Sequence, residues 1–248
     1  MTNGVLTEED ISKLYPYKKI QYDIWEKEIN QKVFNIKKAK FFLPHYPVDY
    51  ISKVIVGLNN YFDYQELYII DHYLAENAVI CDIGANIGNH SIYWAVERKA
   101  KKIYAFEPML DTFLILKTNI ELNLCTECIE AYNLGLMDES CKGEISQYYH
   151  DNIGGTVFQK SNAGNFMFKR LDDIEILEKI DLIKIDVEGA EIECLKGGIN
   201  TISKSKPVIA IETFNDKKEQ VDNFMNSISY KLDCIVRNGE EYIYTYNP

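Results

Sequence analysis

Short apolar runs alternate with longer stretches in which apolar residues recur at helical spacing. The apolar runs lie at 79–83, 102–106, 129–133, 180–185 and 207–211. Runs of this length are typical of strands buried on both faces of a parallel sheet. Helical spacing follows four of the runs, over 91–96, 113–122, 191–195 and 221–228. This alternation predicts a parallel α/β fold.

Two further regions carry the pattern of antiparallel strands. Residues 230–236 and 242–246 are rich in β-branched and aromatic residues, and Asn238-Gly239 between them is a type I′ turn signal. They predict a terminal antiparallel hairpin. Residues 142–170 are polar and rich in glycine, and their alternation around Ile145, Tyr148 and Phe158 predicts short antiparallel strands or loops.

The chain before the first apolar run has a different character. From Thr7 to about Lys40 it is charged and aromatic with partly helical spacing, which predicts an appended helical segment. The prolines at 44 and 47 predict a loop or edge hairpin near the mouth of the domain, where it could cover a substrate. A helical pattern returns over 61–74. We therefore expect an N-terminal helical and loop appendage at 1–60 and the main domain at 61–248.

A glycine-spaced loop follows the first apolar run. Asp82, Gly84 and Gly88 have the spacing Asp-x-Gly-x-x-x-Gly, so the backbone can turn tightly and approach a ligand, and the amides that open the next helix can face it. This spacing is not the Gly-x-Gly-x-x-Gly that seats a pyrophosphate. Glu107 ends the second run about twenty residues later, where a carboxylate can accept both ribose hydroxyls. The pattern indicates an adenosyl ligand without a pyrophosphate.

Composition narrows the class of protein. The 248 residues contain 27 Lys and Arg against 38 Asp and Glu, a net charge of −11, and no dense basic cluster argues for nucleic acid. The six cysteines lie partly in apolar runs, and the Cys125-x-x-Cys128 pair has no second pair at zinc spacing. No basic leader and no apolar run of membrane-span length is present. We expect a soluble, cytoplasmic, single-domain protein with a small-molecule substrate.

Five stretches together resemble the FkbM family of class I S-adenosylmethionine-dependent methyltransferases. They lie at 79–91, 105–108, 153–156, 171–173 and 183–191, and the resemblance extends over roughly 61–246. It implies a Rossmann-like, mostly parallel sheet of seven strands with a C-terminal antiparallel hairpin. It also implies S-adenosylmethionine as cofactor and O-methylation of a sugar hydroxyl, on a nucleotide-activated sugar or a polysaccharide precursor. The first sixty residues carry little of the resemblance.

The same stretches supply candidate cofactor residues. Those in and after the glycine loop are Asp82, Gly84, Ala85, Asn86 and Asn89; Glu107 and Gly135 follow the next two strands. Asp82 could fix the loop or accept a hydrogen bond from the ligand amine, and the backbone near Gly135 would contact adenine. Two structural alternatives stay open: the glycine loop is only a turn, and Glu107 caps the helix after Pro108.

Methyl transfer to a hydroxyl needs alignment of the oxygen and removal of its proton. Asp186 and Glu188 follow the fourth strand and are candidate catalytic groups, as is His90 at the start of a helix. Asp186 and Glu212 could instead hold Mg²⁺ or Mn²⁺.

Each of these residues also has a structural interpretation. Asp186, Glu188 and Glu191 would place negative charge at the start of a helix, where it complements the helix dipole. His90 would be a packing residue. We expect Lys184 to pair with one of the acids.

Two rival functions belong to other classes. A nicotinamide-dependent oxidoreductase is disfavoured by the missing middle glycine of the pyrophosphate fingerprint. A non-catalytic adenosyl-binding scaffold would not need acids at the strand ends, which this sequence has.

Overall fold

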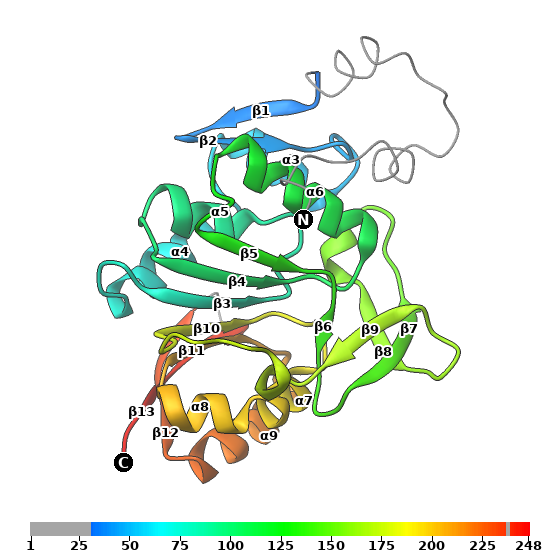
Figure 1. Cartoon of the computed structure of the whole chain (residues 1–248). Coiled ribbons are helices and arrows are strands. Elements are labelled where there is room, and N and C mark those ends of the chain that lie inside the picture. Colours follow the sequence, from blue (N-terminus) through cyan, green and yellow to red (C-terminus); the bar gives the residue numbers. More distant parts are fainter. Residues whose placement is uncertain (1–30, 237–238) are drawn as a thin grey trace.

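A seven-stranded sheet forms the centre of the computed structural model, which describes residues 31–236 and 239–248 (Figure 1). Its strand order is β12-β13-β11-β10-β3-β4-β5. The strands are β3 Val79–Ile83, β4 Lys102–Phe106, β5 Ile129–Tyr132, β10 Leu182–Ile185, β11 Val208–Glu212, β12 Tyr230–Val236 and β13 Glu241–Tyr246. Strands β5, β4, β3, β10 and β11 pair in parallel, and β13 is antiparallel to both neighbours. The predicted Rossmann-like sheet with its terminal hairpin is confirmed; the turn residues 237–238 lie outside the described part.

Helices cover both faces of this sheet, which explains why the inner strands β3, β4, β10 and β11 are mostly apolar. The helices are α3 Tyr50–Leu58, α4 Tyr64–Ile70, α5 Asn89–Val96, α6 Leu110–Leu122, α7 Glu191–Gly197, α8 Ile199–Ser205 and α9 Asn215–Ser227. Within β3, Ile80 joins the core beneath α5 and α6, while Cys81 and Ile83 join the core beneath α7, α8 and α9. The alternation of side chains along a strand therefore fills two cores at once.

A second, smaller sheet projects from the region after β5. Its order is β6-β9-β7-β8, with β6 Gly135–Leu136, β7 Cys141–Gln147, β8 Val157–Lys160 and β9 Phe166–Lys169. The pairings β7–β8 and β7–β9 are antiparallel, as predicted for 142–170. The ring of Phe168 lies against Gly135 and Gly143: a Cβ would come within 2.3 Å of the ring at Gly135 and 2.5 Å at Gly143. Both positions have to lack a side chain for this ring to fit.

The N-terminal region differs from the helical segment predicted for 7–40. Residues 1–30 lie outside the described part, and the residues after them form a hairpin of β1 Val33–Ile36 and β2 Ala39–Phe42. Phe41 and Phe42 are fully buried, and the turn uses a positive φ of 51° at Lys37. The helical prediction was wrong here because β-branched and aromatic residues favour a strand that can bury one face.

The residues after the hairpin pack into the body of the domain. Helix α3 follows the loop that contains the two prolines, and the helix predicted over 61–74 is α4 followed by the 3₁₀ turn Asp71–Tyr73. Ile36, Phe41 and Ile55 belong to the same core as Ile80 and Leu116. The division at residue 60 stays a prediction, but residues 33–58 do not have a core of their own. Within the described residues, no helix is both long and apolar enough to cross a membrane.

Candidate functional site

A pocket of about 190 Å³ lies at the carboxyl ends of β3, β4, β10 and β11. The sheet order changes direction between β3 and β10, and ligands of open α/β sheets bind at such a point. Six lining residues come from these strand ends and define the pocket floor: Gly84, Asn86, Glu107, Asp186, Glu188 and Glu212.

A second group of lining residues comes from segments outside the main sheet. We call it the pocket roof: Tyr50 and Ile51 of α3, Phe62, and residues 152–156. Phe158, Phe168 and residues 135–137 complete the wall from the small sheet. The pocket is thus enclosed by elements from both halves of the chain.

Gly84 is required by the protein's own backbone. It has φ +80°, and a Cβ there would lie 1.8 Å from the carbonyl oxygen of Asp186. The amides of Gly84 and Ala85 both donate to the carbonyl of Phe106, at 3.1 and 2.9 Å. Gly84 therefore allows the loop after β3 to pack against the backbone at the ends of β4 and β10.

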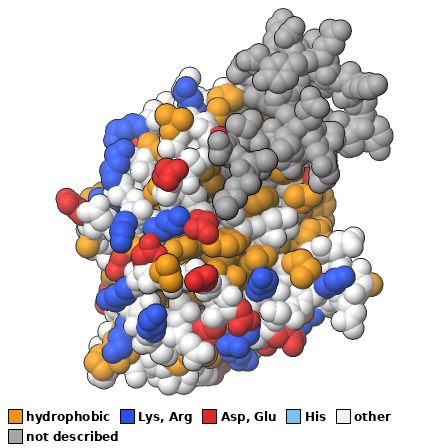
Figure 2. Space-filling model, in the orientation of Figure 1, with side chains coloured by type: hydrophobic (Ala, Val, Ile, Leu, Met, Phe, Trp, Pro, Cys, Tyr) orange, Lys and Arg blue, Asp and Glu red, His pale blue; other side chains and the backbone are white. Residues whose placement is uncertain are grey.

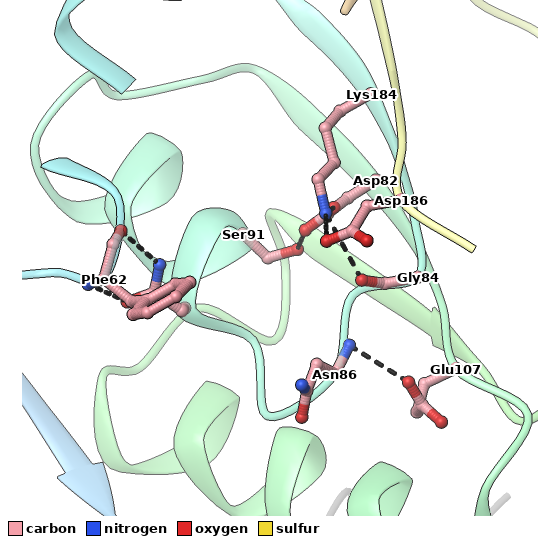
Figure 3. A network of polar contacts seen from close by, with 9 residues as sticks. Phe62, Asp82, Gly84, Asn86, Ser91, Glu107, Lys184 and Asp186 are labelled. Atoms are coloured by element: carbon pink, nitrogen blue, oxygen red, sulfur yellow. Dashed lines mark hydrogen bonds and ion pairs between the residues drawn. The ribbon is translucent and has the colours of Figure 1, made fainter. Parts of the chain in front are cut away.

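Buried charges lie directly beneath the loop (Figure 3). The Nζ atom of Lys184 is 3.0 Å from Oδ2 of Asp186 and 3.8 Å from Oδ1 of Asp82. Lys184 Nζ also donates to the carbonyl of Gly84 at 3.4 Å, and Oδ2 of Asp82 accepts from Ser91 Oγ at 2.5 Å. Burial lowers the pKa of Lys184, but Asp186 and Asp82 outweigh it and raise that pKa above its ordinary value. The predicted pairing of Lys184 with an acid is confirmed.

Glu107 is buried at the end of β4 and lines the pocket. Its Oε2 accepts from the amide of Asn86 at 3.1 Å, and its Oε1 accepts from the amide of Met109 at 2.8 Å. The carboxylate therefore supports both the glycine loop and the start of α6, and its remaining lone pairs can still accept from a ligand. Burial raises the pKa of Glu107 to about 7, against the two backbone hydrogen bonds, which lower it.

Four of the predicted site residues do not line the pocket. Asp82 is buried within β3 and Ala85 is buried within the loop. Asn89 uses its side chain to bond the backbone of Phe62, accepting from its amide and donating to its carbonyl, both at 2.9 Å. His90 lies against Trp94, with ring centroids 5.8 Å apart. Gly84, Asn86, Glu107, Gly135, Asp186, Glu188 and Glu212 are brought together, and their roles stay predictions.

The acids after β10 have different surroundings. Asp186 and Glu188 line the pocket, and Glu188 has a positive φ of 48° in the turn. Glu191 is buried and accepts from the amide of Gly189 at 2.6 Å, in agreement with a structural role at the start of α7.

The predicted metal site rests on Asp186 and Glu212 alone. Within the described residues, no group of three or more His, Cys, Asp or Glu has the arrangement of a metal site. Metal binding by Asp186 and Glu212 stays a prediction.

The roof is held by residues that the sequence did not single out. Asp49 caps α3 by accepting from Ser52, and its Oδ1 accepts from the amide of Ile153 at 3.3 Å. The amide of Tyr50 donates to the carbonyl of Asp151 at 2.7 Å. The Asp-x-x-Ser spacing before α3 was a usable signal for the cap, but nothing local to it indicates the contact with Ile153.

Both the sequence and the fold are similar to those of known methyltransferases. Residues 82–232, more than half of the chain, match the family model of the methyltransferase FkbM domain. Methyltransferase sdnD of Sordaria araneosa is 30% identical over 177 residues, which cover 55% of this chain and 68% of that protein. Hexuronic acid methyltransferase AglP of Haloferax volcanii is 31% identical over 139 residues, covering 54% of this chain and 55% of that protein.

The crystal structure of methyltransferase FkbM from Methylobacillus flagellatus KT has a similar fold. Its TM-score is 0.55 at 22% sequence identity, over 74% of this chain and 48% of that chain. The described chain thus spans only about half of this structure and of AglP. The family match extends from the end of β3 to the start of β12, and so includes all of the pocket floor. The chain therefore belongs to the FkbM family of methyltransferases.

Proposed function

We propose that this protein is an S-adenosylmethionine-dependent O-methyltransferase that acts on a hydroxyl of a sugar or a related small polar acceptor. The observation that carries the proposal is the pocket at the sheet's change of direction, where Glu107 and the glycine loop meet the acids that follow β10 and β11. Membership of a methyltransferase family supports the reaction. The relative named as a hexuronic acid methyltransferase supports a sugar or a nucleotide-activated sugar as acceptor.

The pocket fits the proposed cofactor chemically. Glu107 can accept from the ribose hydroxyls, and Asn86 lies where the methionine part would pass. The backbone of 135–137 beside Phe106 offers an apolar surface to adenine. Four carboxylates line the pocket, which suits a cofactor that carries a net positive charge. The cofactor supplies an electrophilic methyl carbon bound to a sulfonium.

The protein's contribution is to hold the acceptor and take its proton. Asp186 lines the pocket with its carboxylate fixed by Lys184, and Glu188 lies two residues further along. Either carboxylate can accept the hydroxyl proton as the oxygen attacks. Alternatively, Asp186 and Glu212 could hold a Mg²⁺ or Mn²⁺ ion, which would lower the pKa of the hydroxyl. The roof reduces access of water to the reacting atoms.

Incubation with labelled S-adenosylmethionine and a panel of sugars and nucleotide-activated sugars tests the proposal. We expect formation of S-adenosylhomocysteine and a methyl ether on one acceptor. Asp186→Asn should retain cofactor affinity by calorimetry but lower turnover about 10²–10⁴-fold. A chelator should silence the enzyme only if the metal mechanism holds. Cofactor binding without turnover on any acceptor would favour the non-catalytic scaffold. Full activity of Asp186→Asn would exclude Asp186 as the base.

The thiols agree with the proposed setting. All six cysteines are free, and burial raises the pKa of Cys81 and Cys194 above the ordinary thiol value. Free thiols suit a reducing compartment. We therefore propose the cytoplasm as the place where the enzyme works.

A further inference from the structure

The turn between β10 and α7 is held in different ways at its two ends. It begins at Asp186, whose amide donates to the carbonyl of Ile83 at 3.0 Å, so the neighbouring strand fixes the near end. At the far end, the amide of Gly189 donates to Oε1 of Glu191 at 2.6 Å, and the carbonyl of Gly189 accepts from Nζ of Lys217. Both polar backbone groups of this glycine are therefore bound by ionisable side chains.

The backbone of this turn has an uncommon conformation. Glu188 has φ +48° and Gly189 has φ +102°. A residue other than glycine in the left-handed region is strained, and the conformation persists only where its surroundings hold it. The two hydrogen bonds to Gly189 supply such a restraint, because each fixes one of the two peptide groups that flank its Cα atom.

The two side chains that bind Gly189 come from different helices. Glu191 is the first residue of α7 and is 1% exposed. Lys217 lies in the first turn of α9, which packs beside α7 (Figure 1). Burial raises the pKa of Glu191, and the charge of Lys217 opposes that rise. We call Glu191 and Lys217 the clamp.

The clamp lies behind the acids that the proposed function uses. Asp186 and Glu188 line the pocket, while the described lining contains neither Glu191 nor Lys217. Because Glu188 directly precedes Gly189, a shift of the Gly189 backbone also moves the backbone of Glu188. The residues proposed to bind the cofactor follow β3 and β4 instead. Loss of the clamp should therefore disturb the acids more than the cofactor site.

We propose that Glu191 and Lys217 are positioning residues for methyl transfer: they hold the turn 186–189 so that its carboxylates meet the acceptor hydroxyl. Neither residue touches the substrate. The inference rests on the proposed function and adds two residues to it. Displacement of a reacting group by about 1 Å can lower the rate about 10²-fold. A loosened turn should therefore slow the reaction without weakening cofactor binding.

Lys218 supplies a matched control for Lys217. It is the next residue of α9, pairs with Asp222 on the same helix and lies over the ring of Tyr242, 4.3 Å from its centroid. Basic and acidic side chains are interspersed on the surface of the molecule (Figure 2), so the loss of one charge is not informative by itself. A comparison of Lys217→Met with Lys218→Met separates the clamp from a general loss of charge on α9.

The first test needs no acceptor. NMR relaxation gives the order parameter of the Gly189 amide, which we expect to fall from the rigid range of about 0.85 in the wild type to below about 0.6 in Lys217→Met. Lys218→Met should leave it in the rigid range, and amides of β3 should stay rigid in both variants. An equally rigid Gly189 in the wild type and in Lys217→Met would overturn the clamp.

The second test measures turnover on a sugar that the acceptor panel identifies. Lys217→Met should lower kcat about 10–10²-fold and leave the Kd of S-adenosylhomocysteine, measured by calorimetry, within about twofold of the wild type. Lys217→Arg keeps a donor for the Gly189 carbonyl and should recover most of kcat. Wild-type kcat in Lys217→Met, or an equal loss in Lys218→Met, would overturn the positioning role.

The third test combines Lys217→Met with Asp186→Asn and, separately, with Glu188→Gln. If the clamp acts through a carboxylate of the turn, its effect on kcat should largely disappear in at least one of these backgrounds. Additive losses in both would overturn the proposal. Failure of the wild type to bind S-adenosylhomocysteine would overturn the proposed function, whereas the NMR measurement judges the clamp independently.

Discussion

The floor and the roof of the pocket are built in opposite ways. The floor comes from the ends of adjacent strands, and buried charges and a backbone contact hold it together. The roof joins segments that are 104 positions apart in the chain, through an amide hydrogen bond to the cap residue Asp49 and a second amide bond beside it. From this difference we expect substitutions in the floor to destabilise the fold, and substitutions in the roof to be tolerated without loss of the fold. Four predictions, each with a control, test this contrast.

Gly84→Val should have the largest effect. The valine side chain would collide with the carbonyl oxygen of Asp186, and the valine backbone would have to adopt a positive φ. We expect a loss of more than about 4 kcal/mol in the free energy of unfolding, measured in urea. Because the clash is with backbone, loss of ligand binding by this variant would not separate a binding role from a folding role.

The matched control for Gly84→Val is Gly57→Ala. Gly57 lies within α3, and a Cβ there meets no atom within 4 Å. We expect this variant to be as stable as the wild type or more stable by about 0.5–1 kcal/mol, as for Gly to Ala in a helix. A folded Gly84→Val protein of wild-type stability would contradict the view that the floor is rigid.

Lys184→Met should have the second largest effect on stability. It removes the ammonium beside Asp186 and leaves the buried Asp82 without its cationic partner, which we expect to cost about 3 kcal/mol in unfolding free energy. The double variant Asp82→Asn with Lys184→Met should recover part of this loss, as a double-mutant cycle would show. Strict additivity of the two single effects would mean that the 3.8 Å contact contributes nothing.

Glu107 should give the floor a pH dependence. Its folded pKa of about 7 lies above the ordinary value of 4.5 for Glu, so the folded protein holds this proton more tightly than the unfolded chain. The resulting stability is present below pH 4.5 and is lost as the pH rises through about 7, by about 3 kcal/mol. In urea, the free energy of unfolding of the wild type should be higher at pH 5 than at pH 8 by this amount. Glu107→Gln should lack this difference.

Asp49→Ala should have the smallest effect on stability, about 1 kcal/mol for the lost cap. Because it also releases Ile153, we expect the acceptor KM to rise while the cofactor Kd stays the same. Ser52→Ala is the matched control, since it removes one donor to Asp49 but leaves the bond to Ile153. A change in cofactor Kd with an unchanged acceptor KM would show that the roof does not act separately from the floor.

The same contrast explains what could be predicted from the sequence. Strands β3 and β4 were located because their apolar runs are local, and parallel strands necessarily bring Glu107, Asp186 and Glu212 to one edge. Asn89 and His90 do not line the pocket, although their roles stay predictions; local spacing does not show which face of a helix lies toward a pocket, and Phe62 engages Asn89 from 27 positions away. The hairpin at 33–42 was missed because its turn at Lys37 and Lys38 lacks Gly or Asn.

The contact between α3 and the turn at Ile153 also provides a reporter of motion. The amides of Tyr50 and Ile153 both donate across it, to Asp151 and Asp49. These two protons should exchange with solvent whenever the roof lifts, while amides in β3 should exchange only when the whole sheet unfolds. Hydrogen exchange would therefore measure, in the native protein, how often the pocket opens and how much an acceptor slows that opening.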